Sequence, residues 1–215
     1  MSSKKSFRFL FSLASLFLLL CLLVFIFTSE AKAKQVQKGI ADEIIRFHVV
    51  ASGNTYDEQV LKYKVKDALV KELSPLLKDA KSKDQALDII ESRINEIKLT
   101  AEEIITDNSS DNTVSVSLTS AYFPMKVYGS YTFPPGDYDA LQVKIGKAKG
   151  ENWWCVLFPP LCFVDETYSI VDEESGDQLQ YLLTDDEYHE LLSDKEIKVI
   201  YKFKLWELFK DWFFT

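Results

Sequence analysis

The chain has little of the material from which most catalytic and metal sites are built. Its 215 residues include two histidines, three cysteines and seven glycines. So few histidines and cysteines cannot form a multi-ligand zinc cluster without carboxylates, and the cysteine content is far below that of a disulfide-rich scaffold. Residues 146–150 have glycine spacing but lack the Gly-Lys-Ser/Thr ending of a phosphate-binding loop. We therefore expect no metal ion and no cofactor.

The chain also lacks a surplus of basic residues. Acidic residues outnumber basic ones by 33 to 25, which gives a net charge of −8. Proteins that bind nucleic acid neutralise its phosphates with clustered lysine and arginine. The composition therefore argues against a nucleic-acid partner.

One long stretch near the N-terminus lacks charge altogether. Residues 9–27 are uncharged and rich in Leu and Phe, and they follow Lys4, Lys5 and Arg8. As a helix these 19 residues would reach about 28 Å, close to the hydrocarbon thickness of a bilayer. Basic residues before an apolar run keep the N-terminus in the cytoplasm. The sequence therefore predicts that the rest of the chain is exported.

Two interpretations of this export segment remain open. Ala31, Lys32 and Ala33 have the A-x-A form of a signal-peptidase site, which favours a cleaved signal peptide. The apolar run is also long enough for a retained membrane anchor with its N-terminus inside. We thus divide the chain into residues 1–33, a signal peptide or anchor, and residues 34–215, an extracytoplasmic domain.

The exported part is more acidic than the whole chain. Residues 1–33 hold four basic residues and one acidic residue, so residues 34–215 carry 21 basic and 32 acidic residues, a net charge of −11. A domain of this charge should be soluble and should not adhere to anionic lipid head groups.

The spacing of apolar residues predicts one α+β domain, with helices packed on a mostly antiparallel sheet. A short polar linker is expected at residues 33–39, before the first strand. Ser/Thr-x-x-Glu/Gln sequences predict helices that begin after Thr55, Ser82, Thr100 and Thr184. Pro75 marks the end region of the helix after Thr55. Strands are predicted at 44–51, 114–119, 126–133, 141–145 and 197–205, with a turn at 134–137 and a short aromatic helix at 206–214.

The densest segment of the chain is 150–165, which holds two tryptophans, two prolines and two cysteines. Outside the export segment these are the only cysteines, and an exported protein meets an environment in which thiols pair. Pro159 and Pro160 can bend the chain so that Cys155 and Cys162 meet. We expect a disulfide, and a pair of buried apolar thiols is the alternative.

No catalytic group of residues is evident. A cysteine nucleophile needs a base, and only His48 and His189 are candidates. His48 lies in an apolar strand, where a structural role is commoner, and His189 lies on an acidic helix. The aromatic residues Trp153 and Trp154 are either interface anchors or core residues.

At these residues the sequence resembles a known family. Residues 45–52, 128–131, 135–141 and above all the Trp-Trp-Cys block at 150–165 are similar to the stage II sporulation protein R family. The similarity extends over roughly residues 40–165.

The resemblance implies a function that residue spacing alone does not. Proteins of this family are made in the forespore and secreted across its membrane into the space between the two cells. There they activate a membrane-embedded aspartic protease of the mother cell, which cleaves the precursor of sigma-E. On this interpretation the protein is a signal and not an enzyme.

We expect the surface that contacts the protease to lie near the Trp-Trp-Cys block and the first strand. The candidate residues are Arg46, His48, Trp153, Trp154, Phe158, Pro159, Pro160 and Asp165. Two other functions are alternatives: an extracytoplasmic cysteine hydrolase that uses Cys155 or Cys162, and a membrane-anchored structural protein of the spore envelope.

Overall fold

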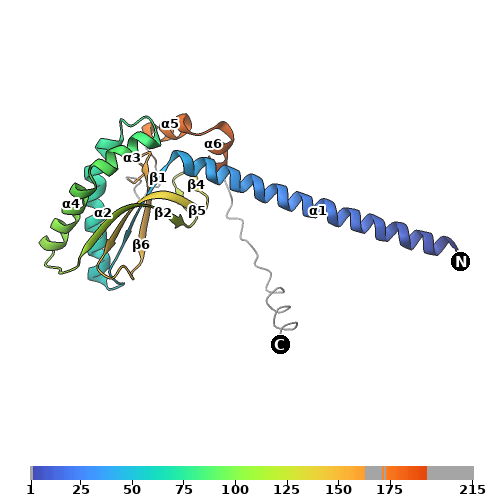
Figure 1. Ribbon diagram of the computed structural model, residues 1–215, viewed down its shortest axis with the longest axis horizontal. Helices are drawn as coiled ribbons and strands as arrows, with labels where there is room; N and C mark the ends of the chain where they lie inside the picture. Colours follow the sequence, from blue (N-terminus) through green and yellow to red (C-terminus); the bar gives the residue numbers. More distant parts are fainter. Residues whose placement is uncertain (1, 163–170, 172, 193–215) are drawn as a thin grey trace.

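A computed structural model describes residues 2–162, 171 and 173–192 (Figure 1). It has a mixed α+β architecture, as the sequence predicts. The elements are α1 (Ser2–Glu43), β1 (Ile45–Val50), α2 (Tyr56–Leu77), α3 (Lys83–Ser92), α4 (Ile94–Asp107), β2 (Val114–Phe123), β3 (Lys126–Tyr128), β4 (Tyr131–Phe133), β5 (Gly136–Ile145), β6 (Asn152–Phe158), α5 (Glu173–Leu182) and α6 (Asp185–Leu192). The expected strand at 197–205 and the expected helix at 206–214 lie outside the described residues.

The main sheet has four strands in the order β2-β5-β1-β6. β1 and β5 are parallel, whereas β2 pairs with β5 and β6 pairs with β1 in antiparallel fashion. The predicted, mostly antiparallel sheet is thus confirmed. β3 and β4 form a separate two-stranded hairpin.

α1 is a single helix of 42 residues that runs from the apolar N-terminal segment into the folded domain. It is long and apolar enough to cross a membrane, and its large apolar side chains from Leu13 to Phe27 are exposed rather than packed on the domain. The predicted polar linker at 33–39 is wrong, because the helix continues through it. Ile40, Ala41 and Ile44 are buried in the domain, and this packing holds the last turns of the helix in place.

Three of the four predicted helix starts are correct. Thr55 and Ser82 cap α2 and α3, and Thr184 exchanges hydrogen bonds with Glu187 at the start of α6. The start at Thr100 is wrong, because Thr100 lies inside α4. Ile97 and Ala101 of α4 are fully buried, so packing extends that helix on both sides of Thr100.

The other corrections concern strands and turns. The single strand predicted at 126–133 is the hairpin of β3 and β4, which turns at Gly129 with φ of 58°. A positive φ costs glycine little, so the chain reverses there. The expected turn at 134–137 is shorter, because β5 already begins at Gly136. β6 was not expected from the sequence as a strand.

The two faces of the main sheet pack into different cores. We call the side covered by α2, α3 and α4 the helical face, and the side covered by the hairpin, α6 and the end of α1 the hairpin face (Figure 1). On β1, Phe47 and Val49 point to the helical face. The residues between them, Arg46 and His48, point to the opposite side, because side chains alternate along a strand.

Candidate functional site

Two of the segments that resemble the family, 45–52 and 150–165, contain neighbouring strands of the main sheet. β1 holds most of the first motif and β6 holds the Trp-Trp-Cys block, with His48 opposite Trp154 and Phe47 opposite Cys155. These two segments lie more than 90 residues apart in the sequence, so only the pairing of β1 with β6 brings them together. The candidate residues of both strands therefore form one continuous area.

Arg46 is fully buried on the hairpin face. Its Nη2 donates a hydrogen bond of 3.4 Å to the hydroxyl of Tyr128, while Nε and Nη1 are buried without a partner. Four rings surround its Cζ at 4.6–5.7 Å from their centroids: Phe123, Tyr128, Phe133 and Tyr138. No described carboxylate forms an ion pair with it. Burial lowers the pKa of Arg46, but a guanidinium keeps its charge in proteins.

His48 lies beside Arg46 and is almost completely buried. Its ring stacks on Trp154, with 4.9 Å between centroids, and lies 5.3 Å from the ring of Phe123. Nε2 of His48 is 2.7 Å from Nε2 of Gln142. Because an amide nitrogen is a donor only, the histidine nitrogen accepts there and Nδ1 carries the proton. That Nδ1 is buried without a partner.

The charge state of His48 follows from its burial. Burial, with smaller contributions from Lys144 and Arg46, lowers the pKa of His48 from 6.5 to about 4. The ring is therefore neutral near pH 7. Its place inside the aromatic cluster is that of a structural residue, as the sequence favours.

Trp153 and Trp154 lie on opposite faces of β6. Trp153 packs on the helical face, where its ring meets Phe47 edge-on at 5.9 Å and Lys66 lies 4.8 Å above it. Trp154 belongs to the hairpin face and contacts His48. Both tryptophans are half-buried, so each keeps some surface for a partner.

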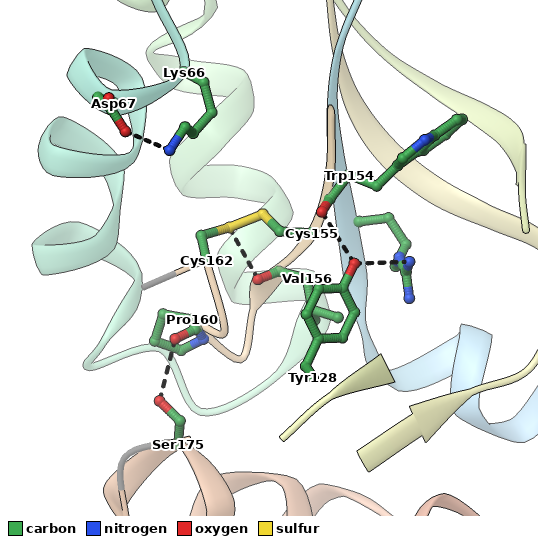
Figure 2. Close-up of a disulfide and its surroundings, with 10 residues drawn as sticks. Lys66, Asp67, Tyr128, Trp154, Cys155, Val156, Pro160, Cys162 and Ser175 are labelled. Atoms are coloured by element: carbon green, nitrogen blue, oxygen red, sulfur yellow. Dashed lines mark hydrogen bonds and ion pairs between the residues drawn. A yellow bond between two sulfur atoms is a disulfide. The ribbon is translucent and has the colours of Figure 1, made fainter. Parts of the chain in front are cut away.

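Cys155 and Cys162 are joined by a disulfide, which agrees with the expectation from the sequence (Figure 2). Their Cα atoms are 5.3 Å apart, and the loop between them turns back so that Leu161 N–H donates to the carbonyl of Val156. Both cysteines are buried.

The proline turn ties this loop to α5. Ser175 Oγ donates a hydrogen bond of 3.2 Å to the carbonyl oxygen of Pro160 (Figure 2). Phe158 and Pro159 are buried, whereas Pro160 is partly exposed. Asp165, the last candidate residue, lies outside the described residues.

Tyr128 of the hairpin connects the two strands of the site. Its hydroxyl accepts from Arg46 and donates a hydrogen bond of 3.1 Å to the carbonyl oxygen of Trp154 (Figure 2). Sequence reasoning missed Phe123, Tyr128 and Gln142 as members of the site. Of these three residues, only Tyr128 could have been identified from the sequence, since it belongs to one of the segments that resemble the family.

The described part of the chain offers little for covalent chemistry. Both cysteines of the domain are bonded to each other, so neither has a free thiol. Among the described residues, no group of three or more His, Cys, Asp or Glu side chains is placed to hold a metal ion. The arrangement instead holds two tryptophans and a hairpin in fixed positions at one edge of the sheet.

Comparison with known proteins identifies the family. Residues 41–168 match the family model "Stage II sporulation protein R". The stage II sporulation protein R of Bacillus subtilis (strain 168) is 34% identical over 171 residues, which cover 74% of this chain and 76% of the relative. No solved structure matches. The chain therefore belongs to the stage II sporulation protein R family.

Proposed function

We propose that the protein is an intercellular signal of sporulation. It is secreted across the forespore membrane into the space between the two cells. There it activates a membrane-embedded aspartic protease of the mother cell, and the protease then processes the sigma-E precursor. The observation that carries this proposal is an apolar helix joined to a domain in which β1 and β6, from two of the segments that resemble the family, pair with each other.

Activation of this kind places a requirement on binding. A ligand shifts a protease toward its active state only if it binds that state more tightly than the inactive one. A shift from 1% to 99% active needs a preference of about 10⁴-fold, or about 5.5 kcal/mol. A rigid surface suits this task, because little binding energy is then lost in ordering it.

Co-expression in a non-sporulating host tests the proposal. The host would carry the candidate protease, the sigma-E precursor and this chain, and precursor cleavage would be followed by immunoblot. We expect cleavage to require the full chain. A matched variant that lacks residues 1–33 keeps the domain inside the cell and should give none. Cleavage that does not depend on this chain would contradict the proposal.

The disulfide separates this function from that of a cysteine hydrolase. A hydrolase would lose all turnover when both cysteines are replaced by serine, whereas a signal keeps activity in proportion to the folded fraction. A structural protein of the spore envelope would instead be present in high copy number with its N-terminal segment retained. Quantitative immunoblots of sporulating cells distinguish that alternative.

A further inference from the structure

Among the described strands, β6 is the outermost one on its side of the sheet. It pairs with β1 on one side, and some of its backbone groups face outward on the other. The carbonyl groups of Trp154 and Val156 point away from β1, because they accept hydrogen bonds from Tyr128 and Leu161. The N–H of Trp154 points the same way, since both groups of a residue face one side in an antiparallel strand. Within the described residues this N–H has no hydrogen-bond partner.

A groove runs along this edge, between β6 and the hairpin. Its volume is about 380 Å³. Its walls include Tyr63, Val127, Tyr128, Trp153 and the disulfide. We refer to it as the β6 groove.

Two features of the β6 groove are those of a binding site for an extended peptide. Asn152 lines it, and the Oδ1 atom of this residue is buried without a hydrogen-bond partner. Natural proteins usually protect an open strand edge with Lys, Pro or a bulge. Residues 152–154 have none of these, and the register shift of this strand lies at its other end. An added strand could accept a hydrogen bond from the outward N–H of Trp154 and place side chains between aromatic walls.

The charge of the groove indicates what kind of segment fits. Lys126 is the one charged side chain among the described lining residues. Lys66 lies nearby, over Trp153, and forms an ion pair with Asp67. Residues 34–215 carry a net charge of −11, so a groove whose described lining holds a basic side chain and no acidic one differs from the rest of the domain. Charge complementarity favours a segment with acidic side chains.

We propose that the β6 groove binds an extended, acidic segment of the partner protein, which adds as a strand beside residues 152–154. This proposal rests on the proposed function, in which the partner is the membrane-embedded protease. It identifies the contact surface with exposed parts of the Trp-Trp-Cys block and the hairpin. Arg46 and His48 then act from beneath, as residues that position Tyr128 and Trp154.

The chain's own C-terminal segment is a poorer occupant by charge. Residues 197–205 alternate apolar side chains with polar ones, and the sequence predicts a strand there. However, this stretch carries Lys198, Lys202 and Lys204 and no acidic residue. Like charges beside Lys126 would oppose its binding.

Site-specific photo-crosslinking tests the proposal. Val127 lines the groove and is 62% exposed, and Leu99 of α4 is a matched control at 64% exposure outside the groove. A benzophenone amino acid would replace each residue in the full chain, co-expressed with the protease. We expect position 127 to crosslink to the protease and position 99 not to. No crosslink at 127, or a crosslink from 127 to residues 193–215 or to a second copy, would overturn the proposal.

Charge substitutions at the same positions supply a second readout. Val127→Glu should weaken precursor cleavage by roughly tenfold or more, because like-charge contacts across an interface cost several kcal/mol. Val127→Lys should lose much less cleavage than Val127→Glu, and Leu99→Glu should have no effect. Equal loss with Glu and Lys would show that charge does not matter, which contradicts an acidic segment.

These outcomes also separate the inference from the proposed function. If the wild-type chain triggers cleavage but position 127 does not crosslink, the β6 groove is not the contact surface, while the proposed function is still supported. If the wild-type chain triggers no cleavage, the function itself fails.

Discussion

The two faces of β1 show how one strand serves two purposes. On the helical face, Phe47 and Val49 are surrounded by apolar side chains of α2, α3 and α4. On the hairpin face, Arg46 and His48 are just as deeply buried but keep three ring and guanidinium nitrogens without a hydrogen-bond partner. Burying unsatisfied polar groups costs free energy. Burial of Phe47 and Val49 on the helical face therefore stabilises the fold. Burial of Arg46 and His48 on the hairpin face costs stability, but these two residues hold Tyr128 and Trp154 in place.

The largest expected effect is on the helical face. Phe47→Ala should lower the free energy of unfolding by about 3–5 kcal/mol, because it leaves a cavity beneath Trp153. Guanidinium unfolding of the full chain in detergent, followed by tryptophan fluorescence, measures the loss. The control Tyr122→Ala removes a 62% exposed ring and should change stability by less than about 0.5 kcal/mol. A small effect of Phe47→Ala would mean that the two faces do not differ as described.

The hairpin face should make stability depend on pH. The pKa of His48 is lowered from 6.5 to about 4, so protonation is disfavoured in the folded state. The stability that this provides is complete above pH 6.5 and is lost as pH falls toward 4, by roughly 3 kcal/mol in all. Unfolding curves at several pH values should show this loss in the wild type and not in His48→Gln. Equal slopes for both proteins would contradict the assignment.

The disulfide should contribute somewhat less than the buried phenylalanine. The loop it closes is short, and the chain-entropy estimate gives about 2.5 kcal/mol. We expect the double variant Cys155→Ser/Cys162→Ser to lose that amount in the same unfolding assay. Adding reductant to the variant should change nothing further, and this serves as the control. Labelling of both cysteines in the wild type without reductant would show that the bond is absent.

The smallest effect is expected at the contact between hairpin and sheet. Tyr128→Phe removes the hydroxyl that joins Arg46 to the carbonyl of Trp154 and should cost about 1 kcal/mol. The ring itself remains, so the fold should persist. If the hairpin holds the groove in shape, the variant should also lower precursor cleavage by more than its stability loss explains. Wild-type cleavage would limit Tyr128 to a structural role.

Local patterns were sufficient for part of the fold. Thr55 and Ser82 were correctly identified as helix caps, because a capping interaction involves only neighbouring residues. Thr100 has the same local pattern yet lies in the middle of α4. Packing of Ile97 and Ala101 against the sheet extends that helix, and no local pattern contains this information. The prediction of a linker at 33–39 was wrong for the same reason, because packing of the following residues in the domain extends α1 through it.

The sequence by itself predicted the apolar N-terminal segment, the acidic composition of residues 34–215, the α+β class and, as the favoured of two alternatives, the pairing of the two cysteines. Each of these depends on composition or on residues close together in the chain. Only the tertiary structure decided that Arg46, His48, Tyr128 and Trp154 form one cluster and that β6 is the outermost described strand on its side of the sheet. Those contacts join residues up to about a hundred positions apart, and strand order, not sequence spacing, sets which of them meet.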